Sequence, residues 1–447
     1  DEFYQKLKLL VLPIAIQNFM LALVSATDAI MLGWIDQTSL SAVSLAGQVQ
    51  FVLSLFISGI AAGAGIMAAQ YWGKQDAASI EKVIPIALRT NLLFSGLFTI
   101  LAGFCPEMLM RIFTNDAALV ASGSQYLRAV ALSYVLCGIS QVYLILLKNT
   151  GHAAVSSRIS STAVVLNIIL NAILIYGLCG APALGIRGAA YATVAARVVE
   201  LIWAYLETKK PERVRILWNR LFSSAGKILS EDFWRYTLPV LAASLVWGIA
   251  YVLYSVIMGH MGSDAVAANS ITSIAKSLLS CLIRGVSGGA GVLIGNLLGA
   301  DELEKAREYG GRLTHLAIAI GVVTGGLLML ISPAIVHFAP LTDTAAEYLQ
   351  YMLLFCGLNL MAQSVNTTVL DGIFCAGGDA KFDMQGNIGA MWCFSVPLGF
   401  LAAFWLKLPV MVVYCIVNLD EIVKLPAVYL HYKKYVWVRN ITRDIEE

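Results

Sequence analysis

Four polar side chains in apolar runs of the sequence are the residues with the clearest potential for chemistry. Asp28 lies in the first apolar run, Asn167 and Asn171 lie in the fifth, and Thr193 lies in the sixth. Asn167 and Asn171 are spaced i and i+4, so they share one face of a helix. Their carboxylate, amide and hydroxyl oxygens suit a small cation such as Na⁺, or a carboxyl group that gains and loses a proton.

The depth of these residues in their predicted helices supports one common site. Asp28, Asn171 and Thr193 each lie five or six residues from the outer end of the predicted helix. At a rise of about 1.5 Å per residue, all three lie about 8–9 Å below the outer surface, with Asn167 one turn deeper. A polar network that only joins the helices would use the same residues. The spacing therefore leaves two alternatives open, an ion-coupling site with Na⁺ as the candidate metal and a structural network.

The elements that must position these residues are predicted to be transmembrane helices. Of the 447 residues, 59% are hydrophobic and 13% are charged, whereas soluble domains carry about 25% charged residues. A helix needs about 20 apolar residues to cross a bilayer. Twelve runs of this kind predict an all-α integral membrane protein in contact with the lipid bilayer, and they cover 9–33, 41–71, 84–104, 119–147, 155–178, 187–207, 234–259, 266–297, 313–338, 345–374, 382–406 and 409–432.

The distribution of Lys and Arg orients these spans. With the N-terminus inside, 22 of the 30 basic residues fall on the inner side, three on the outer side and five within helices. Basic residues are enriched in cytoplasmic loops. We therefore expect a multi-pass protein of the cell (inner or plasma) membrane with both termini cytoplasmic.

An internal repeat organises the chain into two six-helix lobes. Pro13 aligns with Pro239 at a shift of 226 residues, and the register continues without a gap to Gly73 and Gly299. An even number of spans per lobe makes this a parallel repeat, a layout found in transporters. We expect an N-lobe at 1–207, a cytoplasmic linker at 208–230 and a C-lobe at 231–447.

Two further features of the predicted helices concern mechanism. Pro13 removes a hydrogen bond inside the first helix and favours a kink there, which could couple occupancy of Asp28 to helix shape. The C-lobe carries three basic and three acidic residues within its spans, where Asp420 and Lys424 are spaced to pair and Arg284 and Glu421 share a depth. This candidate charge network is either a structural set of ion pairs or a second proton or substrate site, and it comprises Lys276, Arg284, Asp371, Asp420, Glu421 and Lys424.

The sequence excludes several classes of function. No zinc-protease, nucleophile-elbow or Walker-type motif is present, so we expect neither an enzyme nor a nucleotide-driven pump. A net charge of +2 without a basic cluster argues against a nucleic-acid partner. Energy would come from an ion gradient, with no cofactor besides H⁺ or Na⁺ as the coupling ion.

The sequence resembles the MATE family, the multidrug and toxic compound extrusion transporters. The resemblance covers essentially the whole chain and is carried by three segments, 12–18 with 27–33 (LPIAIQN and TDAIMLG), 63–73 (GAGIMAAQYWG) and 166–194 (from LNIILNAILIYGL to GIRGAAYATV). It implies export of small organic, often cationic, compounds in exchange for Na⁺ or H⁺. It also implies a coupling site at the positions of Asp28, Asn167, Asn171 and Thr193.

One departure from the family pattern bears on the ion. The family has an acid where this chain has Asn171, which weakens a tight Na⁺ site and favours H⁺. A flippase for lipid-linked precursors from the same superfamily is the main alternative, although such proteins commonly have fourteen helices. We expect the protein to act as a monomer.

Overall fold

The computed structural model describes residues 2–216, 218–223, 226–339 and 341–444, and the chain packs into two units. The N-half unit comprises residues 16–241, and the C-half unit comprises residues 1–15 and 242–447. Two long helices, α1 (Glu2–Gly33) and α8 (Lys227–Gly259), contribute to both units. These units are defined by packing and are different segments from the two lobes of the sequence repeat.

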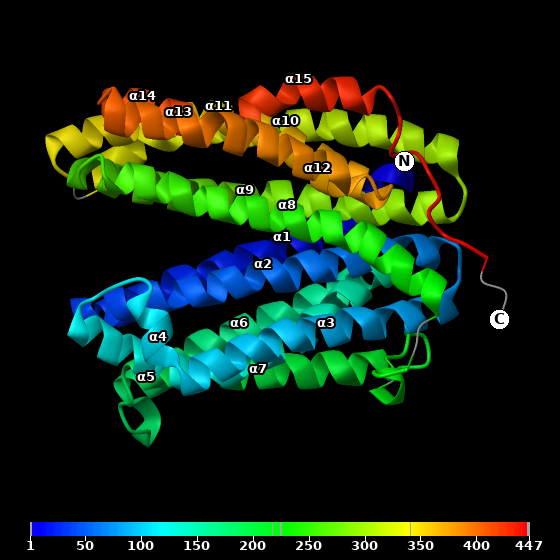
Figure 1. Ribbon diagram of the computed structural model, residues 1–447, viewed down its shortest axis with the longest axis horizontal. Coiled ribbons are helices and arrows are strands. Elements are labelled where there is room, and N and C mark those ends of the chain that lie inside the picture. Colours follow the sequence, from blue (N-terminus) through cyan, green and yellow to red (C-terminus); the bar gives the residue numbers. More distant parts are fainter. Residues whose placement is uncertain (1, 217, 224–225, 340, 445–447) are drawn as a thin grey trace. The chain divides into compact units, whose positions relative to one another are not determined.

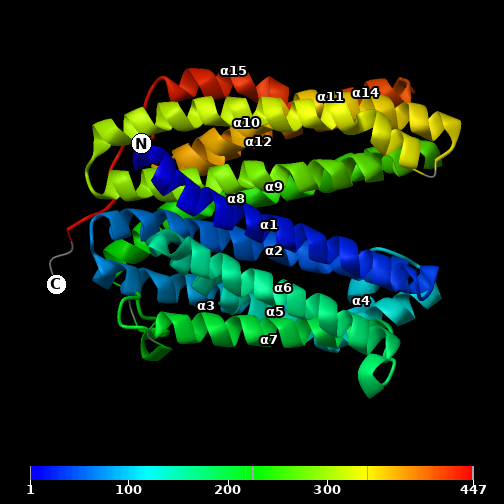
Figure 2. The same ribbon diagram turned by 180° about the vertical axis from the view of Figure 1, so that it is seen from behind.

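The N-half unit is a bundle of long helices that run side by side (Figures 1 and 2). In this unit α7 packs against both α5 and α6, and α5 also packs against α2 and α3. Besides its parts of α1 and α8, the unit contains α2 (Gln37–Gly73), α3 (Ala77–Phe104), α4 (Pro106–Arg111), α5 (Ala117–Leu147), a π-helical turn (Lys148–His152), α6 (Ala153–Tyr176) and α7 (Ile186–Thr208).

The C-half unit is also a bundle of helices without strands in its described residues, but its later helices are less regular. Here α11 packs against α9 and α10. The unit contains α9 (Ser263–Gly299), α10 (Leu303–Phe338), α11 (Asp343–Thr367), α12 (Ala380–Asn387), α13 (Val396–Phe400), α14 (Val410–Val417) and α15 (Asp420–Tyr432), with π-helical segments at Thr368–Phe374, Ile388–Ser395 and Leu401–Trp405.

Short acidic side chains in the loops cap the N-termini of several of these helices. The carboxylate of Asp36 accepts a hydrogen bond from the backbone N–H of Ser39 at 2.6 Å, and Asp76 and Asp116 cap α3 and α5 in the same way. The cap satisfies N–H groups that have no partner within the helix. Because it favours the ionised form, the Ser39 N–H also lowers the pKa of the exposed Asp36 carboxyl below its ordinary value.

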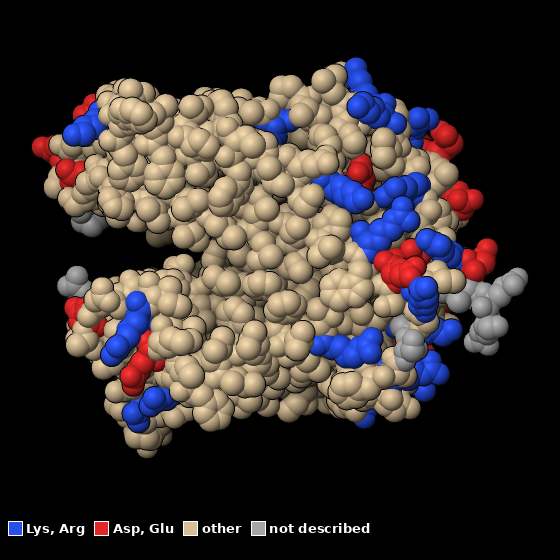
Figure 3. All heavy atoms as spheres, in the orientation of Figure 1, with Lys and Arg blue, Asp and Glu red and all other residues tan. Residues whose placement is uncertain are grey.

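Exposed apolar side chains form stripes on the outer faces of the helices. On α3, Leu93, Leu97, Ile100 and Phe104 recur every three or four residues and are all exposed. Ten helices in the described residues are long and apolar enough to cross a membrane. On the face drawn in Figure 3, most charged side chains lie near the helix ends, and the middle of each unit is mostly uncharged. Exposed apolar surface of this extent is stable in lipid.

The sequence repeat is reproduced in the packing. A Cβ atom on Gly59 of α2 would lie 2.9 Å from the Cα of Leu241 in the N-half unit, and one on Gly285 of α9 would lie 2.9 Å from the Cα of Ala15 in the C-half unit. Both residues of one pair are 226 positions from their counterparts in the other. Glycine therefore permits two equivalent close helix crossings, since small residues let helix backbones approach. The predicted all-α membrane fold is confirmed.

Three predicted spans differ in detail from the helices that form. The spans at 119–147 and 155–178 are α5 and α6, joined through a sharp turn in which Gly151 has φ of 80°. The span at 409–432 is divided into α14 and α15. The backbone carbonyl of Asn418 at this break accepts a hydrogen bond from the Asn359 side chain, which satisfies a polar group that would be unstable alone in the membrane.

Candidate functional site

The structure brings the four predicted N-half residues into one hydrogen-bonded group. The amide nitrogen of Asn171 donates to the carboxylate of Asp28 and, at 3.1 Å, to Oδ1 of Asn167. The amide nitrogen of Asn167 donates in turn to the hydroxyl of Thr193 at 3.3 Å. Asn167 and Asn171 are buried, whereas Asp28 and Thr193 are half-buried. The four predicted residues therefore lie in one hydrogen-bonded group.

Contacts between α1 and α6 explain why Asp28 and Asn171 meet. Gln17 donates to the Ser160 hydroxyl at 2.9 Å, and Asp28 contacts Asn171 eleven residues further along each helix. At the ends of the helices, the hydroxyl of Tyr176 donates to the backbone carbonyl of Met31 at 2.6 Å. The two helices thus run parallel with a constant register, which holds Asp28 opposite Asn171.

The group lies on the wall of a cavity of about 350 Å³ within the N-half unit. Asp28, Asn167 and Thr193 all line it, and Tyr126 of α5 contributes an aromatic wall. Cavities that bind drug-sized molecules have volumes of about 300–1,000 Å³ and carry a few polar groups on mostly apolar walls. The cavity can therefore hold a small organic molecule beside the Asp28 carboxylate.

A second charged group in the same cavity was not predicted from the sequence. Arg197 Nη1 and Glu200 Oε1 of α7 form an ion pair at 2.9 Å, and the hydroxyl of Ser140 on α5 donates to the same Glu200 oxygen at 2.7 Å. Both charged residues line the cavity. The sequence spacing could have indicated this pair, because Thr193, Arg197 and Glu200 are at positions i, i+4 and i+7 and therefore lie on one helix face.

The described residues contain no cluster of three or more His, Cys, Asp or Glu side chains that could hold a metal ion. A cation at the N-half site would therefore be held by the single carboxylate of Asp28 together with neutral amide and hydroxyl oxygens. Such a ligand set suits a proton or a weakly bound Na⁺ better than a tightly bound divalent ion.

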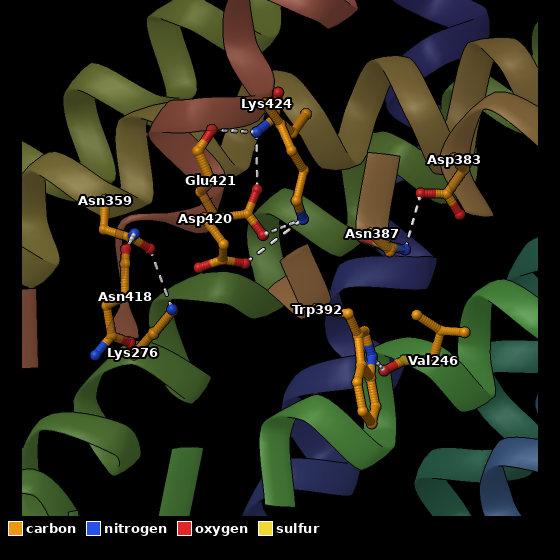
Figure 4. Close-up of polar contacts among 11 residues, drawn as sticks. Val246, Lys276, Asn359, Asp383, Asn387, Trp392, Asn418, Asp420, Glu421 and Lys424 are labelled. Atoms are coloured by element: carbon orange, nitrogen blue, oxygen red, sulfur yellow. Dashed lines mark hydrogen bonds and ion pairs between the residues drawn. The ribbon is translucent and has the colours of Figure 1, made fainter. Parts of the chain in front are cut away.

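The predicted C-half charge network is partly assembled (Figure 4). Lys424 Nζ lies 3.3 Å from Glu421 Oε1 and 3.6 Å from Asp420 Oδ2, so the expected Asp420–Lys424 pair is present. The side chain of Asn366 donates to Glu421 Oε2 at 2.8 Å. Lys276 donates to Oδ1 of Asn359 at 3.2 Å.

Two members of the predicted network form none of the hydrogen bonds and ion pairs given for this cluster, although the Asp371 carboxyl lies within electrostatic range of Lys424, Glu421 and Arg284. Arg284 and Asp371 are exposed, and the suggested Arg284–Glu421 pair is not formed among the described residues, because Glu421 pairs with Lys424 and Asn366 instead. A buried acid outside the prediction, Asp383, accepts a hydrogen bond from Asn387 at 3.2 Å (Figure 4).

Pro13 lies inside α1, which continues as a helix on both sides of it. The division of α1 between the packing units falls after Ala15, and the division of α8 falls after Leu241, two residues beyond Pro239. Proline removes one helical hydrogen bond at each of these equivalent places.

A repeated membrane bundle with a cavity and a half-buried carboxylate on the cavity wall defines the class of multi-pass membrane transporters. The comparisons with known proteins identify the family. The sequence model of the MatE family matches residues 13–173 and again residues 239–401, so the two matches begin 226 residues apart and include most of the chain. The chain belongs to the MatE family.

Relatives in sequence agree with this assignment, and solved structures share the fold. The chain is 21% identical to "Uncharacterized transporter YisQ" of Bacillus subtilis (strain 168), with 96% of this chain and 93% of the relative covered. It is 24% identical to "Probable multidrug resistance protein NorM" of Agrobacterium fabrum, with 85% and 83% covered. Its fold matches a MOP superfamily transporter from Pyrococcus furiosus with a TM-score of 0.86 at 20% identity, covering 96% of this chain and 95% of that one.

Proposed function

We propose that the protein is a secondary active antiporter that exports small organic, often cationic, compounds from the cell in exchange for protons. It would lie in the plasma or inner membrane with both termini in the cytoplasm, act as a monomer and need no cofactor. Na⁺ is the alternative coupling ion. The observation that carries the proposal is the Asp28 carboxylate on the wall of a cavity large enough for a small organic molecule.

Exchange follows from competition for one carboxylate. Ionised Asp28 attracts either a proton or the positive group of a cargo molecule, and binding of one weakens binding of the other. Asn171 and Asn167 orient the carboxylate through the hydrogen bonds described above. Proton entry from outside would then release the cargo, and loss of the proton inside would restore the binding site.

Asn171 favours a proton over Na⁺ as the coupling ion. Its amide nitrogen serves both Asp28 and Asn167, and its Oδ1 is buried without a hydrogen-bond partner among the described residues. A protonated Asp28 keeps an oxygen that can accept the hydrogen bond from the Asn171 amide nitrogen, so protonation leaves these hydrogen bonds in place. A single carboxylate offers Na⁺ weaker electrostatic stabilisation than two would.

Pro13 gives the first helix a point at which binding at Asp28 could alter helix shape. Asp28 lies fifteen residues beyond the proline on the same helix. We expect Pro13→Ala to keep the fold and impair transport. Transport at the wild-type rate would remove Pro13 from the mechanism.

Drug efflux from proteoliposomes tests the proposal directly. A pH gradient and a Na⁺ gradient are imposed separately, and export of a cationic dye is followed for the wild type and for Asp28→Asn. Export by the wild type under the pH gradient alone, lost in the variant, supports proton coupling. Export under the Na⁺ gradient alone would identify Na⁺, and normal export by Asp28→Asn under both gradients would reject the site. The names of the relatives give no support to the lipid-precursor flippase.

A further inference from the structure

The Arg197–Glu200 pair gives the N-half cavity a second charged position at a defined distance from Thr193. Thr193 and Arg197 are one turn apart on α7, which is about 6 Å along the helix axis. Thr193 belongs to the hydrogen-bonded group of Asp28, and Arg197 lines the same cavity. The cavity wall therefore carries the Asp28 carboxylate on one side of Thr193 and the Arg197 guanidinium on the other.

The two partners of the ion pair are exposed to different degrees. The side chain of Glu200 is 2% exposed, whereas that of Arg197 is 19% exposed. Glu200 Oε1 accepts hydrogen bonds from both Ser140 and Arg197. A guanidinium has five N–H donors, so Arg197 keeps donors for the cavity while one of its nitrogens contacts Glu200. A molecule in the cavity would meet the positive end of the pair.

A purely structural role explains Glu200 better than it explains Arg197. Glu200 links α7 to α5 through Ser140. Arg197 pairs with a residue of its own helix, three positions away, so the Arg197–Glu200 contact itself lies within α7 and the link to α5 comes from Glu200. A buried ion pair is often no more stabilising than a neutral, well-packed pair, and an ionisable residue within a membrane bundle is by default a candidate functional residue.

We propose that Arg197, held in place by Glu200, binds the acidic group of an amphoteric cargo whose cationic group is bound by Asp28. The inference rests on the proposed export function and specifies its substrate class, small molecules that carry a basic nitrogen and a carboxylate. Glu200 is a positioning residue, and Arg197 determines specificity. Charge-assisted hydrogen bonds from a guanidinium to a carboxylate are strong and directional, which suits Arg197 to this role.

Two dyes that differ at a single group test this assignment. Rhodamine 110 carries a delocalised cation and a free carboxylate, and rhodamine 123 is its methyl ester. Affinities are measured by fluorescence polarisation at neutral pH with the full chain in lipid nanodiscs and no ion gradient. The main variant is Arg197→Met combined with Glu200→Gln, which removes both charges and keeps an oxygen for the Ser140 hydroxyl.

The expected result is a selective loss. The double variant should bind rhodamine 110 about 10- to 100-fold more weakly than the wild type, as expected for one lost hydrogen bond between charged groups, and rhodamine 123 with nearly unchanged affinity. Glu200→Gln alone should bind rhodamine 110 at least as tightly as the wild type, because the guanidinium then lacks its carboxylate partner. Arg197→Lys should retain part of the preference.

Three results would overturn the assignment: equal weakening of both dyes in the double variant, unchanged binding of rhodamine 110, or weaker binding of rhodamine 110 in Glu200→Gln. Failure of the wild type to bind rhodamine 110 would also overturn it. Absence of ion-driven efflux in the wild type would instead contradict the proposed antiport function. The preference between the two dyes could still be measured, because binding is measured without a gradient.

Discussion

Replacement of Asp28 by Asn is the sharpest test of the coupling site. Asn has nearly the same shape as Asp and keeps an oxygen that can accept the hydrogen bond from Asn171, but it cannot take up a proton at physiological pH. Since Asn171 and Asn167 are neutral, the variant has no titratable acid in the hydrogen-bonded group. We therefore expect intact folding and loss of proton-driven export.

The size of the effect follows from the one carboxylate in the group. A single carboxyl group carries one proton per cycle, and a gradient of one pH unit supplies about 1.4 kcal/mol. For electroneutral exchange with a cation of single charge, this energy sustains about a tenfold concentration ratio of cargo. Asp28→Asn should reduce the ratio to about one, because no proton accompanies the return step.

The assay measures steady-state accumulation of a fluorescent cation in proteoliposomes under a fixed pH gradient. Asp36→Asn is the matched control, since Asp36 lies eight residues further along the chain, outside the cavity, and Asn is an equally good helix cap. This control should retain the wild-type ratio. A ratio near tenfold in Asp28→Asn, with normal amounts of folded protein, would refute the reasoning.

Three further predictions concern ion choice, packing and pH. Asn171→Asp places a second carboxylate beside Asp28 and should make efflux respond to a Na⁺ gradient at equal pH on both sides; no response to Na⁺ would contradict the account of ion choice. Gly63→Ala should destabilise the protein by about 1–3 kcal/mol, because the new Cβ would lie 2.7 Å from the Cα of Thr237. Gly96→Ala places its Cβ in open space and should stabilise the protein by up to about 1 kcal/mol. Unfolding in detergent measures both changes in stability. Asp36→Ala should lower thermal stability at neutral pH, and the difference from wild type should shrink as the pH falls below about 4, the ordinary pKa of Asp. The lowered pKa of Asp36 makes its stabilising contribution present above the unfolded-state value, and the contribution is lost as pH falls through the folded-state value. A difference independent of pH would contradict this role for the Asp36 carboxylate.

The N-half polar group could be predicted because helical geometry converts sequence position into depth. A fixed rise per residue places Asp28, Asn171 and Thr193 at one level once the helix ends are known, and the charge asymmetry of the loops gives their direction. The constant register between α1 and α6 then brings Asp28 to Asn171. Their role as a coupling site stays a proposal.

The ion pairs were harder to predict, because depth does not specify which residues face each other. Arg284 and Glu421 are predicted to share a depth, yet Glu421 contacts Lys424 on its own helix and Asn366 on α11. Arg197 and Glu200 were close in sequence, but only the packing of α5 against α7 shows that Ser140 fixes Glu200 while Arg197 lines the cavity.

The sequence alone determined the membrane-spanning helical fold and its repeat, because apolar length and a constant shift of 226 residues are properties of the chain itself. Tertiary structure decided three other matters: the break in the last span, the division of α1 and α8 between two packing units, and the presence of a guanidinium beside the Asp28 cavity. Each depends on how helices rotate about their axes and pack on their neighbours. Many rotations bury similar apolar area in lipid, so hydrophobicity selects none of them, and close contacts of glycines and polar side chains select one.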